Sequence, residues 1–483
     1  MREAATTEGQ GLAGRTILGY LLMLGLAAAG IIAICEWGTR ALPTPTLEKS
    51  LATDANQAQQ PTSALHLSRL ARLLIALATV IAVGLLFGQI FQRLGQPAVI
   101  GEIVAGIALG PSFLGAEWSA IILPPEIAPN LGMIANLGVI LFMFLVGVEL
   151  NTDLLRTRAH AALAISHASI VLPFLCGGLL AIPLYTRFAE AHVSFTNFTL
   201  FLGVAMSITA FPVLARILAD RNLTQTKLGG IALNCAAIDD ATAWCLLAII
   251  IGIVGAKIET GFWVIGGTLV YLLAMFFIVR PLLQRYLAKI EGQPVNRGAM
   301  AVIFLGVLSS ALATEIIGIH ALFGAFLFGG LIPHQSRIAH QVTSQLEHVV
   351  GVLLLPAYFA FVGMRTQIQL VDCAEQWLWC AAIIAVATIG KFGGTIFAAR
   401  WSGMPWREGA LLGTLMNTRG LMELIVLNVG LELGVISPTL FAMLVIMALA
   451  TTIMTGPVLS LLSKPEDWQL EPSGQRHVSR ASE

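Results

Sequence analysis

Apolar segments of similar length recur from one end of this sequence to the other. An α-helix needs about 20 such residues to cross about 30 Å of hydrocarbon, and short polar stretches separate the segments. The pattern predicts an all-α polytopic membrane domain without a separate soluble module. We expect fourteen spans, near residues 17–37, 68–91, 98–110, 130–150, 160–185, 195–219, 228–256, 262–280, 299–317, 319–333, 347–364, 377–399, 407–430 and 437–462.

The first predicted span differs from the others. A polar linker from Pro43 to Ser63 separates it from the rest, and a basic residue, Arg15, precedes its apolar run. These features are also compatible with a signal peptide. Because no clean small-x-small cleavage site follows it, we expect a retained anchor, so that residues 1–67 form an anchor span and a linker.

Basic residues occupy alternate connections between the predicted spans. Short cytoplasmic loops collect Lys and Arg, so these connections and the short tail, residues 463–483, are predicted to be cytoplasmic. The basic residues concerned are Arg93, Arg156, Arg158, Arg221, Lys227, Arg280, Arg285, Lys289, Arg297, Arg337, Arg400 and Arg407 in the loops, and Lys464, Arg476 and Arg480 in the tail. The other face carries isolated charges, among them Arg187, Lys257 and Arg365.

Composition removes several functional classes. Only 11% of residues are charged, and 27 basic residues balance 27 acidic ones, so no basic arm is present to bind nucleic acid. The sequence contains no Walker loop, HExxH motif or Rossmann fingerprint. We therefore expect no cofactor and no ATP-driven pumping within this chain.

Three charges lie deep inside predicted spans. Asp239 and Asp240 follow Lys227 by about 18 Å of helix, and Lys391 precedes Arg400 by about 13 Å, so both sets lie at similar depth. An Asp or Lys at a helix centre costs about 2.5–3.5 kcal/mol on insertion scales, and a buried ion pair that only joins two helices seldom offsets its desolvation. We therefore expect these residues to be functional.

Two adjacent carboxylates permit a specific chemistry. Neighbours on a helix point about 100° apart, so one can face Lys391 while the other faces a water-filled cavity. A proton and a metal cation can then compete for the second carboxylate. Competition at one site that opens alternately to each side is antiport.

Two predicted spans look broken. Pro212 lies in SITAFPVLARIL and removes a backbone donor in mid-span, and a Thr-Arg-Gly triplet interrupts MNTRGLMELIVLNVG. Unwound backbone at membrane depth is tolerated where it lines a cavity. We expect Thr209 and Thr418 to occupy equivalent places and to help bind a small cation, and Arg419 with Glu423 either to neutralise half-helix ends or to form a local structural pair. A plain kink at Pro212 is the alternative.

A weak internal repeat supports this arrangement. Residues 144–151 echo 359–366, and residues 101–111 echo 324–333. The partners are seven predicted spans apart, and an odd offset reverses the direction through the membrane, so the halves are expected to be inverted repeats, as in alternating-access carriers. Other embedded polar groups are expected to be structural: Glu102, Glu149, Glu315, His167 and His320.

Together, GQPAVIGEIVAGIALGPS, FLVGVELN, SITAFPVLARIL, IDDATAW, the Lys391 stretch and MNTRGLMELIVLNVG resemble the monovalent cation:proton antiporter superfamily, in particular its second branch of Kef-type and plant cation/proton exchanger proteins. The resemblance covers about residues 68–462. It implies a dimer of thirteen-span protomers with two crossed broken helices. The dimerisation part would comprise 68–150 and 299–364, and the ion-transport core 160–256 and 377–462.

The resemblance also implies roles for individual residues. Asp240 looks like the essential cation- and proton-binding carboxylate, Asp239 like its acidic neighbour, Lys391 like the lysine that pairs with this site when no cation is bound, and Thr209 like the threonine at the first break. Kef-like relatives often have Gln or Asn before the Asp, whereas a paired Asp-Asp resembles electrogenic sodium/proton exchangers. The extra first span departs from the family pattern.

We therefore expect a secondary active antiporter of Na⁺ or K⁺ and H⁺ in a bacterial inner membrane, embedded in lipid as a homodimer. A gated K⁺ efflux channel on the same scaffold is one alternative, and an organic-anion carrier using Lys391 is another. An intramembrane aspartyl protease would need two carboxylates converging from separate helices, which the Asp239 and Asp240 pair does not offer.

Overall fold

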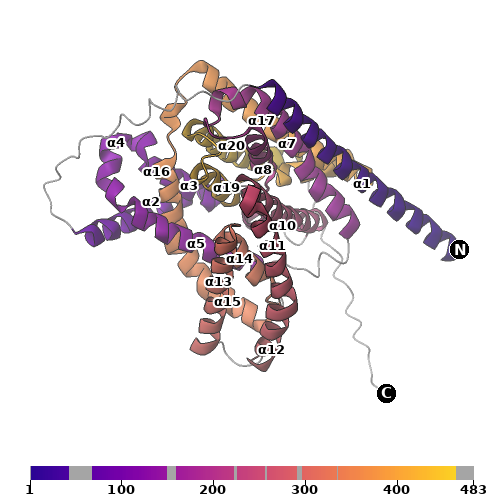
Figure 1. Ribbon diagram of the computed structural model, residues 1–483, viewed down its shortest axis with the longest axis horizontal. Helices are drawn as coiled ribbons and strands as arrows, with labels where there is room; N and C mark the ends of the chain where they lie inside the picture. The colour runs from indigo at the N-terminus through magenta and orange to yellow at the C-terminus, as the bar shows by residue number, and fades with distance from the viewer. Residues whose placement is uncertain are drawn as a thin grey trace.

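The computed structural model describes residues 2–42, 68–149, 159–221, 223, 226–255, 258–290, 296–333 and 336–463. Every regular element longer than a turn in these ranges is a helix (Figure 1). The predicted linker from Pro43 to Ser63 and the tail beyond residue 463 lie outside the described residues. The helices are α1 (Arg2–Ala41), α2 (Arg69–Arg93), α3 (Ala98–Leu109), α4 (Pro111–Ile122), α5 (Ala128–Glu149), α7 (Ala159–Phe188), α8 (Phe195–Ser207), α9 (Phe211–Asp220), α10 (Lys227–Gly255), α11 (Ile258–Ala274), α12 (Arg280–Ile290), α13 (Arg297–Ile317), α14 (Ala321–Gly330), α15 (Arg337–Val349), α16 (Leu355–Arg365), α17 (Ala374–Trp401), α18 (Trp406–Met416), α19 (Leu421–Glu432) and α20 (Pro438–Leu462).

Helices occupy all fourteen predicted positions. Within the described residues, eleven helices are long and apolar enough to cross a membrane, two further pairs qualify as bent spans, and α14 is a shorter apolar helix. The all-α polytopic fold predicted from the sequence is therefore confirmed.

Several boundaries differ from prediction. The expected span 319–333 is only the ten-residue α14, which begins after the left-handed Gly318 has ended α13 and itself ends at Gly330. The span 98–110 continues after a 61° bend into α4, which begins at Pro111, a residue that suits a first helical turn. The span 347–364 begins earlier, at Arg337.

The helices form two groups by their contacts. In the first, called the panel group here, α2 packs on α3, α3 on α16, α5 on α14 and α16, and α13 on α14. In the second, the crossing group, α7 packs on α8, α10 and α17, and α17 packs on α18 and α20. Figure 1 shows α2–α4 and α16 at the left, α13–α15 in the lower lobe, and the crossing group from the upper centre to the right. The extra helix α1 contacts α7 and α8, so it is attached to the crossing group.

Glycines allow the closest helix contacts of the panel group. A Cβ atom added at Gly106 or Gly363 would lie 2.0–2.3 Å from a backbone oxygen across the α3–α16 contact, and one at Gly147 or Gly329 would lie 2.2–2.3 Å from one across α5–α14. Only glycine permits such an approach. The sequence echo relates α3 to α14 and α5 to α16, so the two contacts are repeats of each other. This is why the echo is carried by glycine.

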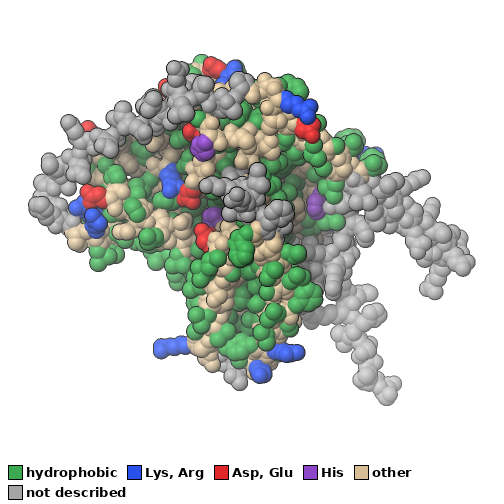
Figure 2. Space-filling model, in the orientation of Figure 1, with side chains coloured by type: hydrophobic (Ala, Val, Ile, Leu, Met, Phe, Trp, Pro, Cys, Tyr) green, Lys and Arg blue, Asp and Glu red, His purple; other side chains and the backbone are tan. Residues whose placement is uncertain are grey.

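The outer surface suits a lipid environment. Hydrophobic side chains cover most of the visible lower lobe, and Lys and Arg side chains gather at its tip, where α12 lies (Figures 1 and 2). Large apolar side chains such as Phe277 (74% exposed) and Ile278 (58%) point outward, which would be unfavourable in water. The chain is a multi-pass integral membrane protein.

Candidate functional site

Two broken helices meet inside the crossing group. The first break, residues 208–210, joins α8 to α9, and the second, residues 417–420, joins α18 to α19 with a bend of 50°. The Ala210 N–H donates to the Thr418 carbonyl at 2.9 Å, which ties one break to the other. A Cβ at Gly420 would lie 2.8 Å from Val213 Cγ2, so a glycine lets the two segments cross.

The position of Pro212 in the span predicts that it removes a hydrogen bond in mid-helix, but in the structure it does not. It lies in the first turn of α9, where the backbone N–H groups have no partner within the helix. The break is therefore made by the extended residues before it, Ile208 and Ala210, and Pro212 fixes where the second half-helix begins.

Arg419 joins the end of one half-helix to the start of another. Its guanidinium donates to the carbonyls of Ala205 and Met206, in the last turn of α8, and to Glu423 Oε2 at 3.0 Å. A helix C-terminus carries unsatisfied carbonyls and partial negative charge, and its N-terminus partial positive charge. Arg419 complements the negative C-terminus of α8. Glu423, in the first turn of α19, complements the positive N-terminus of that helix. Both side chains are fully buried.

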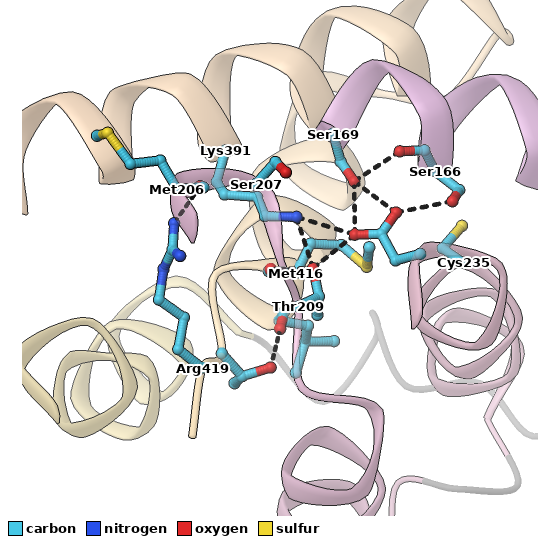
Figure 3. Close-up of polar contacts among 12 residues, drawn as sticks. Ser166, Ser169, Met206, Ser207, Thr209, Cys235, Lys391, Met416 and Arg419 are labelled. Carbon is cyan, nitrogen blue, oxygen red and sulfur yellow. Dashed lines mark hydrogen bonds and ion pairs between the residues drawn. The ribbon is translucent and has the colours of Figure 1, made fainter. Parts of the chain in front are cut away.

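Lys391 is paired with Asp239. The Lys391 ammonium lies 2.8 Å from Asp239 Oδ2, and both side chains are 0% exposed. Thr209 Oγ1 lies 2.6 Å from the same carboxylate oxygen and accepts from the ammonium, also at 2.6 Å. Ser166 donates to Asp239 Oδ1 at 2.7 Å, and Ser169 contacts both oxygens at 3.0–3.1 Å. Figure 3 shows these groups converging from α7, α10, α17 and the first break.

Asp240 is in a different environment from its neighbour. It is only 2% exposed, and neither carboxylate oxygen has a hydrogen-bond partner among the described residues. The backbone N–H of Phe211, at the start of α9, lies near this carboxylate without meeting hydrogen-bond geometry. A buried, charged carboxylate without partners is costly, and a proton, a water molecule or a bound cation would each lower that cost.

The structure thus brings together most of the residues selected from the sequence. Asp239, Lys391 and Thr209 form one contact cluster, and Asp240 adjoins it on α10. The Thr418 hydroxyl instead donates back to Leu415 in its own turn, and only the Thr418 carbonyl takes part in the crossing. Thr209 and Thr418 therefore do not play equivalent parts.

Sequence reasoning missed two ligands of Asp239. Ser166 and Ser169 are three residues apart on α7 and so lie on one helix face, which was the available signal. Asn417 belongs to the interruption that the sequence places in the second broken span, and its buried side-chain amide has no partner among the described residues. Such groups are normally satisfied by water or an ion.

Comparison with known proteins identifies relatives over most of the chain. Residues 76–464 match the family model described as sodium/hydrogen exchanger, transmembrane. The chain is 43% identical over 396 residues to the Na(+)/H(+) antiporter NhaS4 of Synechocystis, covering 80% of this chain and 96% of that one. It is 38% identical to the cation/H(+) antiporter 17 of Arabidopsis thaliana, covering 89% of this chain and 52% of that one.

More distant matches agree with these. The K(+)/H(+) antiporter 1 of Saccharomyces cerevisiae is 34% identical, with 77% of this chain and 44% of that one covered. The chain therefore spans about half the length of its plant and yeast relatives. Among solved structures, the sodium proton antiporter MjNhaP1 of Methanocaldococcus jannaschii matches with a TM-score of 0.59 and 15% identity, covering 81% of this chain and all of that one. That match shows a shared fold.

Proposed function

Since the chain belongs to the sodium/hydrogen exchanger transmembrane family, we propose that it is a secondary active antiporter of H⁺ and Na⁺ or K⁺, with both ions competing at Asp240. The observation that carries the proposal is the contrast between the two carboxylates. Asp239 is fully engaged by Lys391 and three hydroxyls, whereas Asp240 is buried with no partner in the part of the chain that the structure describes. One carboxylate is held by the protein, and the other is left for the transported ions.

Charge balance couples the two ions. The Lys391 and Asp239 charges cancel, so the centre is neutral when Asp240 holds either a proton or a monovalent cation. With neither, it carries one uncompensated negative charge in a water-excluded place, and moving that charge through the protein is unfavourable. The carrier therefore changes sides only when loaded. A proton moving one way and a cation moving the other is the result.

The two helix groups suggest how the site changes sides. We propose that residues 160–256 and 377–462 move as the transport core against residues 68–150 and 299–364, which form the dimer contact. The crossing of the broken helices supports this division, because hydrogen bonds from Ala210 and Arg419 join both half-helix pairs into one unit. On the positive-inside rule, the C-terminus is cytoplasmic. We place the protein in a bacterial inner membrane.

The alternatives are less well supported. An organic-anion carrier would need an available cation, but the Lys391 ammonium is already compensated by Asp239. A peptidase would need Asp239 and Asp240 to share one water, but Asp239 is saturated by other partners. We therefore do not propose an enzymatic activity. A K⁺ channel on this scaffold remains an outcome of the test below.

The test is dissipation of a pH gradient in proteoliposomes on addition of Na⁺, K⁺, Li⁺ or choline, with and without a valinomycin clamp of the membrane potential. We expect a response to at least one alkali cation, none to choline, and no response from Asp240→Asn. The matched control is Asp220→Asn, the same chemical change in the exposed Arg216–Asp220 pair, which should exchange normally. Cation flux without proton movement would indicate a channel, and retained exchange in Asp240→Asn would refute the assigned site.

A further inference from the structure

One ion pair joins the two helix groups. Arg365, the last residue of α16 in the panel group, donates through Nη1 to Glu432 Oε1 at 2.9 Å and to Asn428 Oδ1 at 2.8 Å. Both acceptors are on α19 of the crossing group, one turn apart. Asn428 also donates to Glu432 Oε1 at 3.1 Å, so the three side chains form a closed triangle, called the boundary triad here.

The triad is positioned from both sides. The Arg365 guanidinium stacks over the Phe361 ring of its own helix, 4.2 Å from the ring centroid, which orients it toward α19. On the other side, Asn428 and Glu432 lie on the helix that begins at the crossing, where Glu423 meets Arg419. A displacement of the crossing therefore moves Asn428 and Glu432 with it.

Among the ion pairs between described residues, the Arg365–Glu432 pair alone crosses the boundary between the groups. Pairs such as Arg187–Glu375 and Arg72–Glu126 each lie inside one group. A crevice of about 600 Å³ reaches the triad, with Arg365 and Glu432 in its wall beside residues of α5. Their side chains are 33% and 36% exposed, so water can solvate both charges once they separate.

We propose that Arg365 is a positioning residue for transport, which holds the crossing group in the conformation described here by closing the face where α16 and α19 end. This inference rests on the proposed antiport. Any sliding of the crossing group past the panel group must separate Arg365 from Glu432 and Asn428. The triad therefore biases the equilibrium between the two orientations of the site without contacting the transported ion.

The test is the KM for the exchanged cation, measured separately from each face of oriented proteoliposomes. Apparent affinity falls in proportion to the fraction of carriers that face the ligand. In Arg365→Gln we expect the KM at the triad's face to fall about threefold or more and the KM at the opposite face to rise. The charge-swapped variant Arg365→Glu with Glu432→Arg should return both towards wild type.

Arg187→Gln is the control, because it breaks an Arg–Glu ion pair that lies within the crossing group, with side chains 45% and 65% exposed. It should leave both KM values unchanged. A general loss of structure in Arg365→Gln would raise the KM at both faces together. Equal KM changes on the two faces, no change on either, or an Arg187→Gln effect as large as that of Arg365→Gln would overturn the proposal.

A second measurement separates failure of this inference from failure of antiport. Hydrogen–deuterium exchange at residues 428–434, in detergent, does not depend on transport. We expect faster exchange there in Arg365→Gln than in Arg187→Gln, since the triad no longer protects the end of α19. If the wild type transports no ions, the proposed function is refuted, but the hydrogen–deuterium comparison still tests the triad. Equal deuterium uptake in the two variants would refute the role of the triad.

Discussion

The ammonium of Lys391 lies 2.8 Å from Asp239 and not against Asp240, the next residue of the same helix. Successive helical residues point about 100° apart, so a single turn of α10 presents one carboxylate to α17 and the other to the beginning of α9. The two aspartates are thus chemically different although they are adjacent in sequence. Three predictions concern this difference and the charges around the helix breaks, and a fourth concerns the backbone at His320.

Neutralising the two aspartates should affect stability in opposite ways. Asp239→Asn leaves Lys391 buried without its counter-charge, and breaking a buried pair costs about 3–5 kcal/mol. Asp240→Asn removes a buried carboxylate that has no partner among the described residues, so it should leave stability unchanged or raise it. Thermal unfolding in detergent, followed by tryptophan fluorescence, compares the two. Equal melting temperatures would contradict the assigned difference.

Removing the charge of Lys391 should change how exchange depends on pH. In Lys391→Met, the negative charge of Asp239 beside the ion site is no longer compensated, so Asp240 releases its proton only at higher pH. We expect half-maximal exchange to shift to higher pH. The measurement is the cation-induced dequenching of a pH-sensitive dye at a series of pH values on both sides of neutrality. Lys391→Arg, which keeps the charge, should shift the profile less; a profile identical to wild type in Lys391→Met would make Lys391 purely structural.

The Arg419 and Glu423 pair should be replaceable only as a pair. Arg419→Met alone leaves Glu423 buried without its partner and the last carbonyls of α8 uncapped, and should cost several kcal/mol. Adding Glu423→Leu removes the stranded charge, so the double variant should melt above the single one. A double variant that melts lower than Arg419→Met would show that Glu423 has another partner that stabilises it.

His320 carries backbone strain that can be measured. It lies between α13 and α14 with φ of 89°, a value unfavourable for any residue with a Cβ. His320→Gly and His320→Ala both remove the ring, but only Gly relieves the strain. We expect His320→Gly to be more stable than His320→Ala by about 1–3 kcal/mol. Equal thermal unfolding of the two variants would show that the backbone there is unstrained.

The prediction of α14 illustrates the limits of hydrophobic pattern. The run 319–333 is apolar enough to cross a membrane, yet its helix has ten residues. Hydropathy reports how strongly residues prefer lipid or protein interior to water. It does not report how long the resulting helix is or whether that helix crosses the membrane. α14 is buried among its neighbours, with Phe323, Phe326 and Phe328 at most 8% exposed. A helix enclosed by protein can be short, because the surrounding helices supply the apolar environment.

The sequence by itself determined the membrane class, the positions of the helices, the two helix breaks and the rare embedded charges, because each depends on local composition or on the cost of placing a charge in hydrocarbon. Only the tertiary structure decided which aspartate meets Lys391, that Ser166 and Ser169 complete the Asp239 site, and that Arg365 reaches Glu432 from a helix 67 residues away. Those contacts depend on the rotation of each helix about its axis and on its tilt. Both are fixed by side-chain packing across the whole bundle, which no local stretch of sequence contains.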